Sequence, residues 1–368
     1  MQKLLCIVGS MNRGGAETFL MKLYRQLDHA KYQMDFCVAS RTPGDYDEEI
    51  KKSGGKILYT VPKSSNPFAS FWNMYKIVKE NKYLSVLRIS QHSLSCLELL
   101  AARLGGAKQI IFRSSNTQSC GSIINRILHY IFIPCAYFIP NVRIAPSDKA
   151  AKFMFGTKKG VHILHNGLDT KTFAFSAINR QKIRAELIAE NKFVVGHIGR
   201  FNFQKNHKFL LQIFAELKKI RPDAILWLAG KGELEQNIKE QAKNLNISDS
   251  INFLGIRTDI PELLSAIDVF IFPSLFEGMP NTVIEAQTSG LPCLIADTIT
   301  KQAKQTDIVH FMGLNGMPAQ WAKKALEIAS VQTLGNRPKA AAQMQAAGYD
   351  IKDVVKQFTA LVFGEKNV

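Results

Sequence analysis

Short apolar segments alternate with amphipathic segments along nearly the whole chain, and this alternation limits its possible folds more than any other feature. In the first half, the strand-like segments are 3–9, 33–38, 56–60, 84–89, 109–113, 142–146 and 161–164, with helical patterns at 15–28, 69–81, 93–105 and 148–155. In the second half, strands at 193–199, 224–229, 251–254, 268–272, 292–296 and 308–311 alternate with helices at 206–220, 232–244, 281–289 and 316–329. This alternation predicts an α/β fold with parallel sheets and right-handed crossovers.

The two series and the length of 368 residues predict two doubly wound, Rossmann-like domains. We expect an N-terminal domain over 1–165 and a C-terminal domain over 170–348. Turn residues at 165–169 mark the join, and the polar stretch that follows, to about Asn191, is expected to be irregular. A last helical pattern at about 350–364 is expected to pack back on the first domain. Ligands of such folds bind at the carboxyl ends of the strands, which would face each other across a cleft.

The net charge of +17 is concentrated in the first half of the chain. Residues 1–165 contain 23 lysines and arginines against 10 acids, and residues 81–160 contain 11 against 2. A basic half beside a nearly neutral half predicts an anionic partner: a phospholipid surface, a lipid diphosphate or nucleic acid. General solubility is the alternative explanation. Nucleic acid is the weakest candidate, because the basic half has no recognised nucleic-acid module or aromatic stacking motif.

Cysteine placement and the apolar segments indicate a cytoplasmic protein. The six cysteines (6, 37, 96, 120, 135 and 293) contain no C-x-x-C pair, and we expect reduced core residues. The apolar run at the N-terminus is too short for a signal peptide and is expected to form a first strand. The segment Ile127–Ile139 is interrupted by Pro134 and is well below the roughly 20 residues that a membrane span needs.

Two glutamates eight residues apart, Glu277 and Glu285, mark the most informative local pattern. Pro280 or Asn281 is expected to open a helix, which leaves Glu277 in the loop ahead of it and Glu285 about one turn inside. The amides of 278–282 would point out of the positive end of this helix, which favours a phosphate, while carboxylates accept hydrogen bonds from hydroxyls. A nucleotide sugar fits this arrangement. The alternative is two acids that only complement the helix dipole.

Two further loops follow predicted strands and contain groups that suit an anionic ligand. Gly14 and Gly15 let the backbone approach a ligand at a helix N-terminus, although a tight strand–helix turn explains them equally. Arg200 and Lys205 leave a strand end together, and one forked cation with one point cation suits a diphosphate. Solvated surface charges are the alternative for this pair. Asn206 is expected to cap the helix that follows. The chain has no G-x-G-x-x-G fingerprint and no Walker A pattern.

Two single residues and one acidic pair complete the candidates. Arg257 follows a strand and is a candidate contact for the nucleotide base. His92 follows the strand 84–89 and is a candidate catalytic residue, with a satisfied or exposed histidine as the alternative. Asp45 and Asp47 form a D-x-D pair, but they lie in a run of acids that opens a solvated helix rather than at a strand end. We therefore expect neither a metal nor another cofactor.

In their order and spacing, these motifs are found again in one enzyme family. The motifs are GGAE at 14–17, NG at 166–167, GR-x4-KN at 199–206, FLG at 253–255 and E-x7-E at 277–285. Together they resemble a retaining glycosyltransferase of family 4 with the GT-B fold, and the branch that builds bacterial capsule, exopolysaccharide or lipopolysaccharide. The resemblance covers nearly the whole chain.

The resemblance implies metal-independent transfer of a hexose, with retained anomeric configuration, from a nucleotide sugar expected to be UDP-linked. The acceptor would be a saccharide or a polyprenyl-diphosphate-linked saccharide. Glu285 would bind the ribose, Arg200 and Lys205 would neutralise the diphosphate, and Gly15 would approach it from the other domain. The donor sugar would be held by Glu277, Gly278, Met279, Pro280 and Asn281.

One departure from the family concerns the acceptor side. Relatives often have histidines where this chain has the segment 112–117, which contains Arg113. His92 is then the better candidate histidine of the first domain, and Arg113 offers a cation to an acceptor phosphate. The basic first half and the aromatic segment 127–139 also suggest docking on the inner face of the membrane, although such a segment is more often a core helix.

Two other classes of function use the same donor half. A GT-B-like epimerase or hydrolase of sugar nucleotides would need no acceptor groove. A non-catalytic nucleotide-sugar binder would retain Glu285 and show no turnover.

Overall fold

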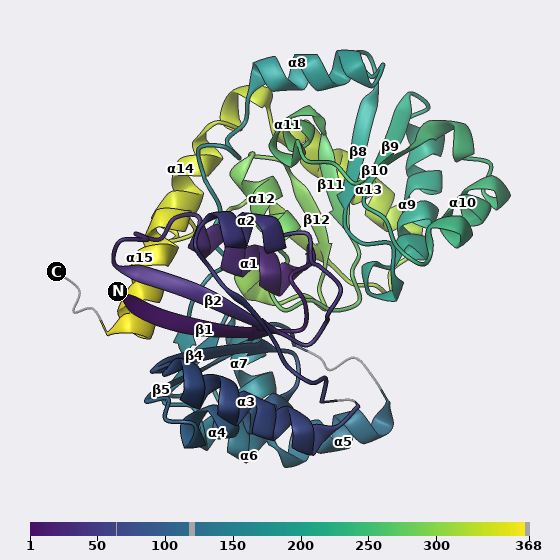
Figure 1. The fold of residues 1–368 in the computed structure, drawn as a ribbon. Helices are drawn as coiled ribbons and strands as arrows, with labels where there is room; N and C mark the ends of the chain where they lie inside the picture. Colours follow the sequence, from purple (N-terminus) through teal and green to yellow (C-terminus); the bar gives the residue numbers. More distant parts are fainter. Residues whose placement is uncertain (64, 118–121, 365–368) are drawn as a thin grey trace. The chain divides into compact units, whose positions relative to one another are not determined.

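The computed structural model describes residues 1–63, 65–117 and 122–364. The chain divides into two compact units. Unit 1 comprises Met1–Gly167 together with the chain from Ile351, and unit 2 comprises Leu168–Asp350. Each unit contains one sheet covered by helices, and all strand pairs in both sheets are parallel (Figure 1). The predicted α/β fold is confirmed.

The sheet of unit 1 has seven strands in the order β3-β2-β1-β4-β5-β6-β7. The strands are β1 Gln2–Val8, β2 Tyr32–Val38, β3 Ile57–Tyr59, β4 Ser85–Ser90, β5 Gln109–Ser114, β6 Val142–Ala145 and β7 His162–Ile163. Successive side chains of a strand point to opposite faces, so Leu4 and Cys6 enter one core cluster while Leu5 and Ile7 enter another. Burial on both faces explains why the central strands are largely apolar.

The helices of unit 1 are α1 Gly15–Tyr24, α2 Asp47–Lys52, α3 Pro67–Asn81, the short turn η1 Ser93–Ser95, α4 Cys96–Leu104, α5 Ile123–Ile131, α6 Ile133–Phe138, α7 Asp148–Phe155 and α15 Ile351–Phe363. Several of these helices, among them α3, α5 and α7, begin at residues whose side chains cap them. At α3, the side chain of Asn66 accepts a hydrogen bond from the Ala69 amide, and Pro67 occupies the first helical position. The apolar segment 127–139 lies in α5 and α6. Over the residues that the structure describes, no helix is both long enough and apolar enough to cross a bilayer.

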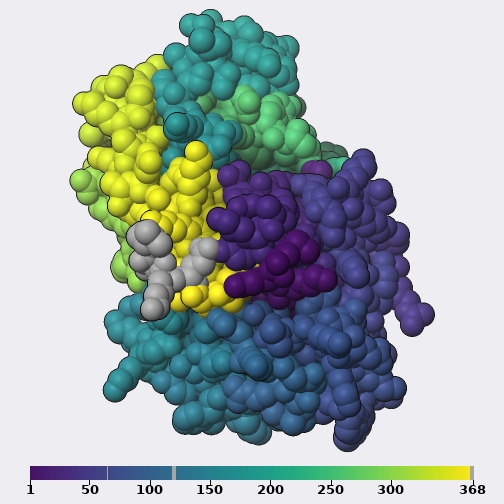
Figure 2. Space-filling view, turned by 60° about the vertical axis from the view of Figure 1, so that its left-hand side comes forward, coloured from purple at the N-terminus to yellow at the C-terminus, as the bar shows by residue number. Residues whose placement is uncertain are grey.

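The last helix, α15, completes the core of unit 1. It contacts α1, and Phe363 stacks on Tyr32 with ring centroids 4.4 Å apart. Figure 2 shows this yellow helix against the purple N-terminal elements. Val354, Phe358 and Val362 recur at helical spacing and are fully buried, which explains why the sequence pattern located this helix.

The sheet of unit 2 has six strands in the order β10-β9-β8-β11-β12-β13. The strands are β8 Phe193–Ile198, β9 Ala224–Ala229, β10 Ile251–Gly255, β11 Val269–Phe272, β12 Cys293–Ala296 and β13 Val309–Met312. From β8 the chain winds outward in one direction, and from β11 it winds in the other. The boundary between β8 and β11 is therefore the topological switch point of this sheet.

Helices and short turns connect the strands of unit 2. They are α8 Ala177–Glu186, η2 Phe203–Lys205, α9 His207–Ile220, α10 Glu235–Asn244, η3 Ser248–Ser250, α11 Ile260–Ala266, α12 Asn281–Thr288, η4 Lys301–Ala303, α13 Pro318–Val331, η5 Leu334–Asn336 and α14 Lys339–Ala346. Trp321 of α13 is fully buried, and its ring lies edge-on to Phe209 of α9 at a centroid distance of 5.7 Å.

The prediction of an irregular stretch over 170–191 was wrong, because α8 lies within it. The helix has few apolar residues, so its sequence shows a weak core pattern. It begins with Ser176, whose side chain accepts a hydrogen bond from the first turn. Arg180 and Arg184 then attach it to Asp268. Tertiary ion pairs therefore stabilise this helix in place of an apolar face.

The cysteines agree with the prediction except at one position. Cys6, Cys37, Cys96 and Cys293 are free and buried. Cys135 is free but exposed, because α6 turns this part of its surface to solvent, so its placement in the core was wrong. Cys120 lies outside the described residues.

Candidate active site

The switch point of unit 2 brings together the loops that contain the predicted donor-binding residues. Arg200 and Lys205 follow β8, and Glu277 follows the neighbouring strand β11. Adjacent parallel strands end at the same edge of a sheet, so the two loops meet there. This edge is where open α/β folds bind their ligands.

Lys205 and Glu277 form an ion pair at this edge. The distance from Lys205 Nζ to Glu277 Oε1 is 2.6 Å, and the two side chains are only 15% and 9% exposed. The ammonium also lies 4.6 Å from the centroid of the Phe272 ring. A charge held from two sides at a largely dry site has a defined position before any ligand arrives.

Backbone contacts between the two loops hold this pair in place. The Leu275 amide donates to the Gln204 carbonyl over 2.9 Å, and Gln204 Nε2 donates to the Phe276 carbonyl over 2.8 Å. Asn206 adopts a left-handed conformation with φ of 54°, and its side chain donates to the Pro273 carbonyl over 3.2 Å. Asn206 occupies the N-cap position of α9, as predicted, but its side chain connects the two loops and makes no cap hydrogen bond.

Arg200 has a different environment from Lys205. Its Nη2 lies 3.2 Å from Glu233 Oε2, and both side chains are exposed. Exposed pairs of this kind contribute little to stability, so Arg200 can leave Glu233 at small cost. The structure thus separates the two predicted cations into one fixed ammonium and one surface guanidinium.

The helix α12 begins as its sequence predicts. Pro280 occupies the N-cap position, Asn281 is the first helical residue, and Glu285 lies at the start of the second turn. Residues 277–280 are buried, whereas Asn281 and Glu285 are half-buried. The first amides of α12 point toward the loop that contains Glu277, and a helix N-terminus favours negative charge.

Two buried histidines behind Lys205 were not identified from the sequence. The ring centroids of His197 and His207 are 4.8 Å apart, and His197 Nδ1 donates to the Ile271 carbonyl over 2.9 Å. Burial, and then the charge of Lys205, lower the pKa of His207 to about 4. Burial, followed by the His207 and Lys205 charges, holds the pKa of His197 well below its usual range. Both rings are therefore neutral at pH 7, and they surround the ammonium without competing for its negative partner.

Arg257 lies in a separate ion-pair cluster. Its guanidinium donates to Asp259 from Nε and Nη2, and its Nη1 lies 3.1 Å from Glu186 Oε1. The hydrogen bonds to Asp259 are the main reason that the pKa of Arg257 is raised. A nucleotide base would therefore have to contact Arg257 at the edge of this ion-pair cluster.

The candidate glycines and His92 lie at the switch point of unit 1. Gly14 and Gly15 follow β1, and His92 follows the adjacent strand β4. Gly15 is the first residue of α1, its φ is not positive, and an added Cβ would meet no atom within 4 Å. Neither packing nor backbone conformation requires a glycine at this position.

Both ring nitrogens of His92 are engaged within unit 1. Nδ1 accepts from the Leu94 amide over 3.2 Å, and Nε2 donates to the Asn125 carbonyl over 2.5 Å. The ring therefore connects the η1 turn to α5. His92 would have to leave these contacts to handle a substrate proton.

Arg113 is a buried cation. It is 2% exposed, its guanidinium lies 3.8 Å above the Phe19 ring, and Nη2 donates to Asn166. Burial lowers its pKa to about 9, and no carboxylate offsets this within the described residues. A guanidinium that is buried without a carboxylate partner is expensive, and such groups are often found at functional sites.

The D-x-D pair is used structurally. Asp45 Oδ2 accepts from the Arg13 amide over 2.9 Å, and Asp47 is buried at the start of α2. Nowhere in ranges 1–63, 65–117 and 122–364 do three histidine, cysteine, aspartate or glutamate side chains group in a way that could hold a metal ion.

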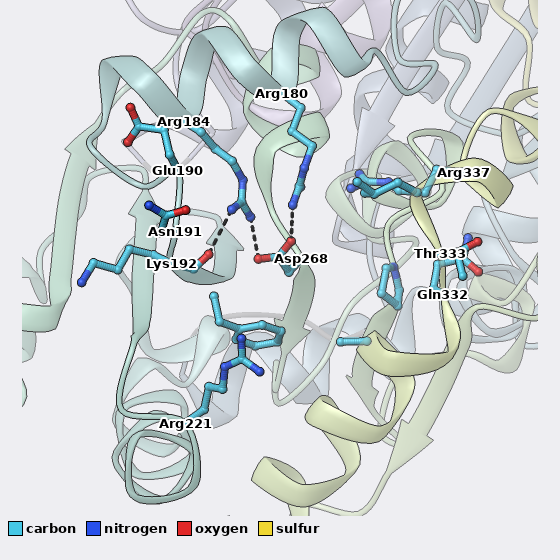
Figure 3. A pocket seen from close by; sticks show the side chains of 14 residues that line it. Arg180, Arg184, Glu190, Asn191, Lys192, Arg221, Asp268, Gln332, Thr333 and Arg337 are labelled. Atoms are coloured by element: carbon cyan, nitrogen blue, oxygen red, sulfur yellow. Dashed lines mark hydrogen bonds and ion pairs between the residues drawn. The ribbon is translucent and has the colours of Figure 1, made fainter.

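An arginine cluster lines a hollow of about 460 Å³ at the other edge of the unit 2 sheet (Figure 3). Asp268 directly precedes β11, so this hollow lies at the amino ends of the strands. Arg180 and Arg184 each bind one oxygen of Asp268 at 2.5 Å. Arg337 is buried and donates to the carbonyls of Leu264, Ser265, Ile267 and Ser289. These donors satisfy the end of α11, which indicates a structural role.

Comparison with known proteins identifies the family. The family described as Glycosyl transferases group 1 matches residues 179–337. EpsF of Bacillus subtilis, named as a glycosyltransferase, is 36% identical over 349 residues, which cover 92% of this chain and 89% of EpsF. An Escherichia coli enzyme named UDP-Gal:alpha-D-GlcNAc-diphosphoundecaprenol alpha-1,3-galactosyltransferase is 29% identical, over 77% of this chain and 76% of that enzyme.

A solved structure extends the comparison to the whole fold. HepE of Anabaena, crystallised in complex with UDP, superimposes with a TM-score of 0.80 over 99% of this chain and 100% of HepE, at 18% identity. At this identity the likeness concerns the fold. The chain therefore belongs to the group 1 glycosyltransferases, has the GT-B fold, and resembles the members of the bacterial capsule and exopolysaccharide branch.

Proposed function

We propose that this protein transfers a hexose from a UDP-linked sugar to a lipid-linked saccharide in bacterial surface polysaccharide synthesis, with retained anomeric configuration. The observation that supports this most directly is the buried pair of Lys205 and Glu277 at the switch point of unit 2. The E. coli relative is named for a UDP-sugar donor and a diphosphoundecaprenol acceptor, and the Anabaena structure contains UDP. These names favour the same classes of donor and acceptor here.

In the proposed complex, the ribose, the hexose and the diphosphate of the donor each bind residues of unit 2. Glu285 accepts hydrogen bonds from the ribose hydroxyls, and Glu277 with the amides of 278–281 holds the hexose. Lys205 and Arg200 neutralise the diphosphate. When a sugar hydroxyl donates a hydrogen bond to the Glu277 carboxylate, the Lys205 ammonium can direct one N–H toward the β-phosphate and keep its position.

The proposed reaction breaks the bond between the anomeric carbon and the β-phosphate oxygen. The acceptor oxygen bonds to the same face of that carbon, and its proton passes to the departing phosphate oxygen. Charge develops on this oxygen in the transition state, so Lys205 and Arg200 stabilise it there. In this proposal the two cations do the work that a metal ion does in other glycosyltransferases, and no cofactor is needed.

The acceptor side of the proposal rests on unit 1. Arg113 offers a buried positive charge to an acceptor phosphate, and Gly15 lets the backbone approach the donor diphosphate. His92 stays a candidate for acceptor-side proton handling. We place the reaction in the cytoplasm, at the inner face of the membrane, since lipid-linked acceptors are anchored there.

The first test is a donor screen followed by product analysis. UDP-hexoses are expected to raise the melting temperature more than GDP-hexoses, since saturating ligand stabilises the folded state by a few kcal/mol. With a polyprenyl-diphosphate saccharide, NMR of the product is expected to show the anomeric configuration of the donor, with EDTA present or absent. Epimerised donor would favour the epimerase, free hexose the hydrolase, and binding without turnover the non-catalytic binder.

Gly15→Ala is expected to lower kcat/KM roughly 10–100-fold while the melting temperature stays unchanged. An added methyl group has room in the fold but obstructs a ligand that contacts the backbone, and small misplacements at a reacting centre are costly. The measurement is transfer kinetics beside thermal unfolding. Gly335→Ala is the matched control, because a Cβ there also meets no atom within 4 Å and that glycine lies outside the proposed site. Unchanged kinetics in Gly15→Ala would remove Gly15 from the site.

A further inference from the structure

The helix α5 exposes its apolar stripe and buries one polar side chain, His129. Ile123, Ile127 and Ile131 follow one another at four-residue spacing and therefore lie along one side of the helix. His129 lies on the opposite side, and it is the residue of α5 that is fully buried. A surface helix of a globular domain normally buries its apolar stripe. Here the stripe is exposed, and the buried side chain is that of His129.

We define the α5 face as Ile123, Ile124, Ile127, Tyr130 and Ile131. All five side chains are 54–69% exposed. Contiguous apolar groups of this kind usually mark a surface that contacts a protein or a membrane. The isoleucines lie on one continuous side of a nine-residue helix, so scattered surface exposure does not account for them.

Specific polar contacts fix this orientation of the helix. His129 Nδ1 accepts from the Ser93 amide over 3.1 Å, and its Nε2 donates to the Phe153 carbonyl over 3.1 Å. Ser93 Oγ donates to the His129 carbonyl, and His92 donates to the Asn125 carbonyl. Rotating α5 to bury its isoleucines would break these bonds and leave buried polar atoms without partners. The exposed stripe is therefore part of the folded state.

A second apolar group flanks the same η1 turn. The N-terminal half of α3 exposes Phe68 and Trp72. Leu94 of η1 lines a small cavity together with Pro67 of α3, while α5 contacts η1 from its own side. Tryptophan is enriched where proteins meet the headgroup region of a bilayer.

The part of the chain that contains the α5 face has a net positive charge. Residues 81–160 contain 11 lysines and arginines and only 2 acids, Glu98 and Asp148. Glu98 pairs with Arg88 at 2.7 Å, and Asp148 pairs with Lys158 at 2.9 Å. Both acids are therefore already neutralised within the fold. A basic surface around an apolar stripe suits a leaflet that contains anionic lipids.

We infer that the α5 face inserts into the headgroup region of an anionic phospholipid bilayer, with Trp72 at its edge. This inference rests on the proposed function for its location and adds the surface that makes the contact. Two basic surfaces of this charge repel each other, so a second copy of the chain is a poorer occupant than an anionic leaflet.

Vesicle co-sedimentation of the full chain tests the inference. The vesicles contain phosphatidylglycerol and phosphatidylethanolamine, with pure phosphatidylcholine as the neutral comparison. The double substitution Ile127→Asn with Ile131→Asn is expected to weaken binding at least about tenfold, because two isoleucines no longer enter an apolar medium. The matched control is Ile178→Asn with Ile256→Asn in unit 2, whose side chains are 77% and 64% exposed. This control is expected to bind like the natural chain.

Tryptophan fluorescence gives an independent readout. Of the three tryptophans, Trp227 and Trp321 are buried and Trp72 is exposed. A blue shift on adding anionic vesicles therefore reports on Trp72, and we expect it to be smaller in the α5 variant. Raising the salt to roughly 1 M, where the Debye length is about 3 Å, is expected to weaken binding.

Several outcomes would overturn the inference. Equal vesicle binding by the α5 variant and the natural chain would do so, as would equal binding to neutral and anionic vesicles. A dimer in light scattering that the α5 substitutions dissociate, without vesicle binding, would assign the face to a second copy. Transfer to a short, water-soluble acceptor tests the proposed function separately, because the α5 variant is expected to keep that activity.

Discussion

Replacing Lys205 by methionine is expected to lower kcat by roughly 10²–10³, which corresponds to about 3–4 kcal/mol of transition-state stabilisation. The ammonium lies 2.6 Å from Glu277 in a largely buried pair, so its position is set before the donor binds. Charge develops on the departing phosphate oxygen only during the reaction, and an oriented cation therefore acts mainly on kcat. The measurement is steady-state transfer from a UDP-hexose.

Two controls separate the loss of the cation from loss of structure. Methionine leaves the Glu277 carboxylate buried without its partner, so Lys205→Met combined with Glu277→Gln removes that unpaired charge. We expect the double variant to regain stability in thermal unfolding; its kcat stays low, since Glu277 also holds the donor sugar. Lys239→Met is the matched control, because its ammonium pairs with Glu235 on the partly exposed α10 surface, and it is expected to keep the full rate. Wild-type kcat in Lys205→Met would contradict the proposed mechanism.

Replacing Asp268 by asparagine is expected to lower the free energy of unfolding by about 3–5 kcal/mol. The carboxylate binds Arg180 and Arg184 through its two oxygens and also accepts from the Val194 amide over 2.8 Å. Asparagine keeps the shape of the Asp268 side chain but removes its negative charge. The positive charges of the buried guanidinium groups are then uncompensated. Among them, Arg337 already has its pKa lowered to about 9, mainly by burial.

Urea unfolding followed by circular dichroism measures this effect. Asp223→Asn is the matched control, since Asp223 pairs with Arg221 at the surface over 2.8 Å. It is expected to cost less than about 1 kcal/mol. If both variants lost equally little stability, the arginine cluster would not be the structural attachment that its contacts indicate.

Local periodicity explains why most of the fold was predictable. The central strands of both sheets are buried on both faces, so each of them forms a short, largely apolar run between turn residues. The start of α12 was predictable for the same kind of reason, because Pro280 and Asn281 follow a strand and a loop and precede an apolar helix. The helix α8 was not predicted from the sequence, because it is stabilised by ion pairs to Asp268, which is distant in the sequence.

The partners of individual side chains were less predictable than the helices and strands. Arg200 and Lys205 are five residues apart, and the sequence suggests one shared task, yet the fold gives one a buried carboxylate and the other an exposed one. The pair of Lys205 and Glu277 joins loops on adjacent strands, and nothing in either loop alone specifies it. An apolar pattern also does not specify its surroundings. The sequence favoured a core helix over a membrane contact for the segment 127–139, whereas the isoleucines of α5 are exposed.

The place of α15 has a consequence for how this chain folds during synthesis. Unit 2 is continuous from Leu168 to Asp350, whereas unit 1 takes α15 from beyond it. On the ribosome, the early strands of unit 1 emerge long before α15, which contributes Phe358 and its neighbours to their core. Until α15 emerges, the nascent unit 1 therefore exposes apolar surface. A chaperone is expected to bind this unit during synthesis.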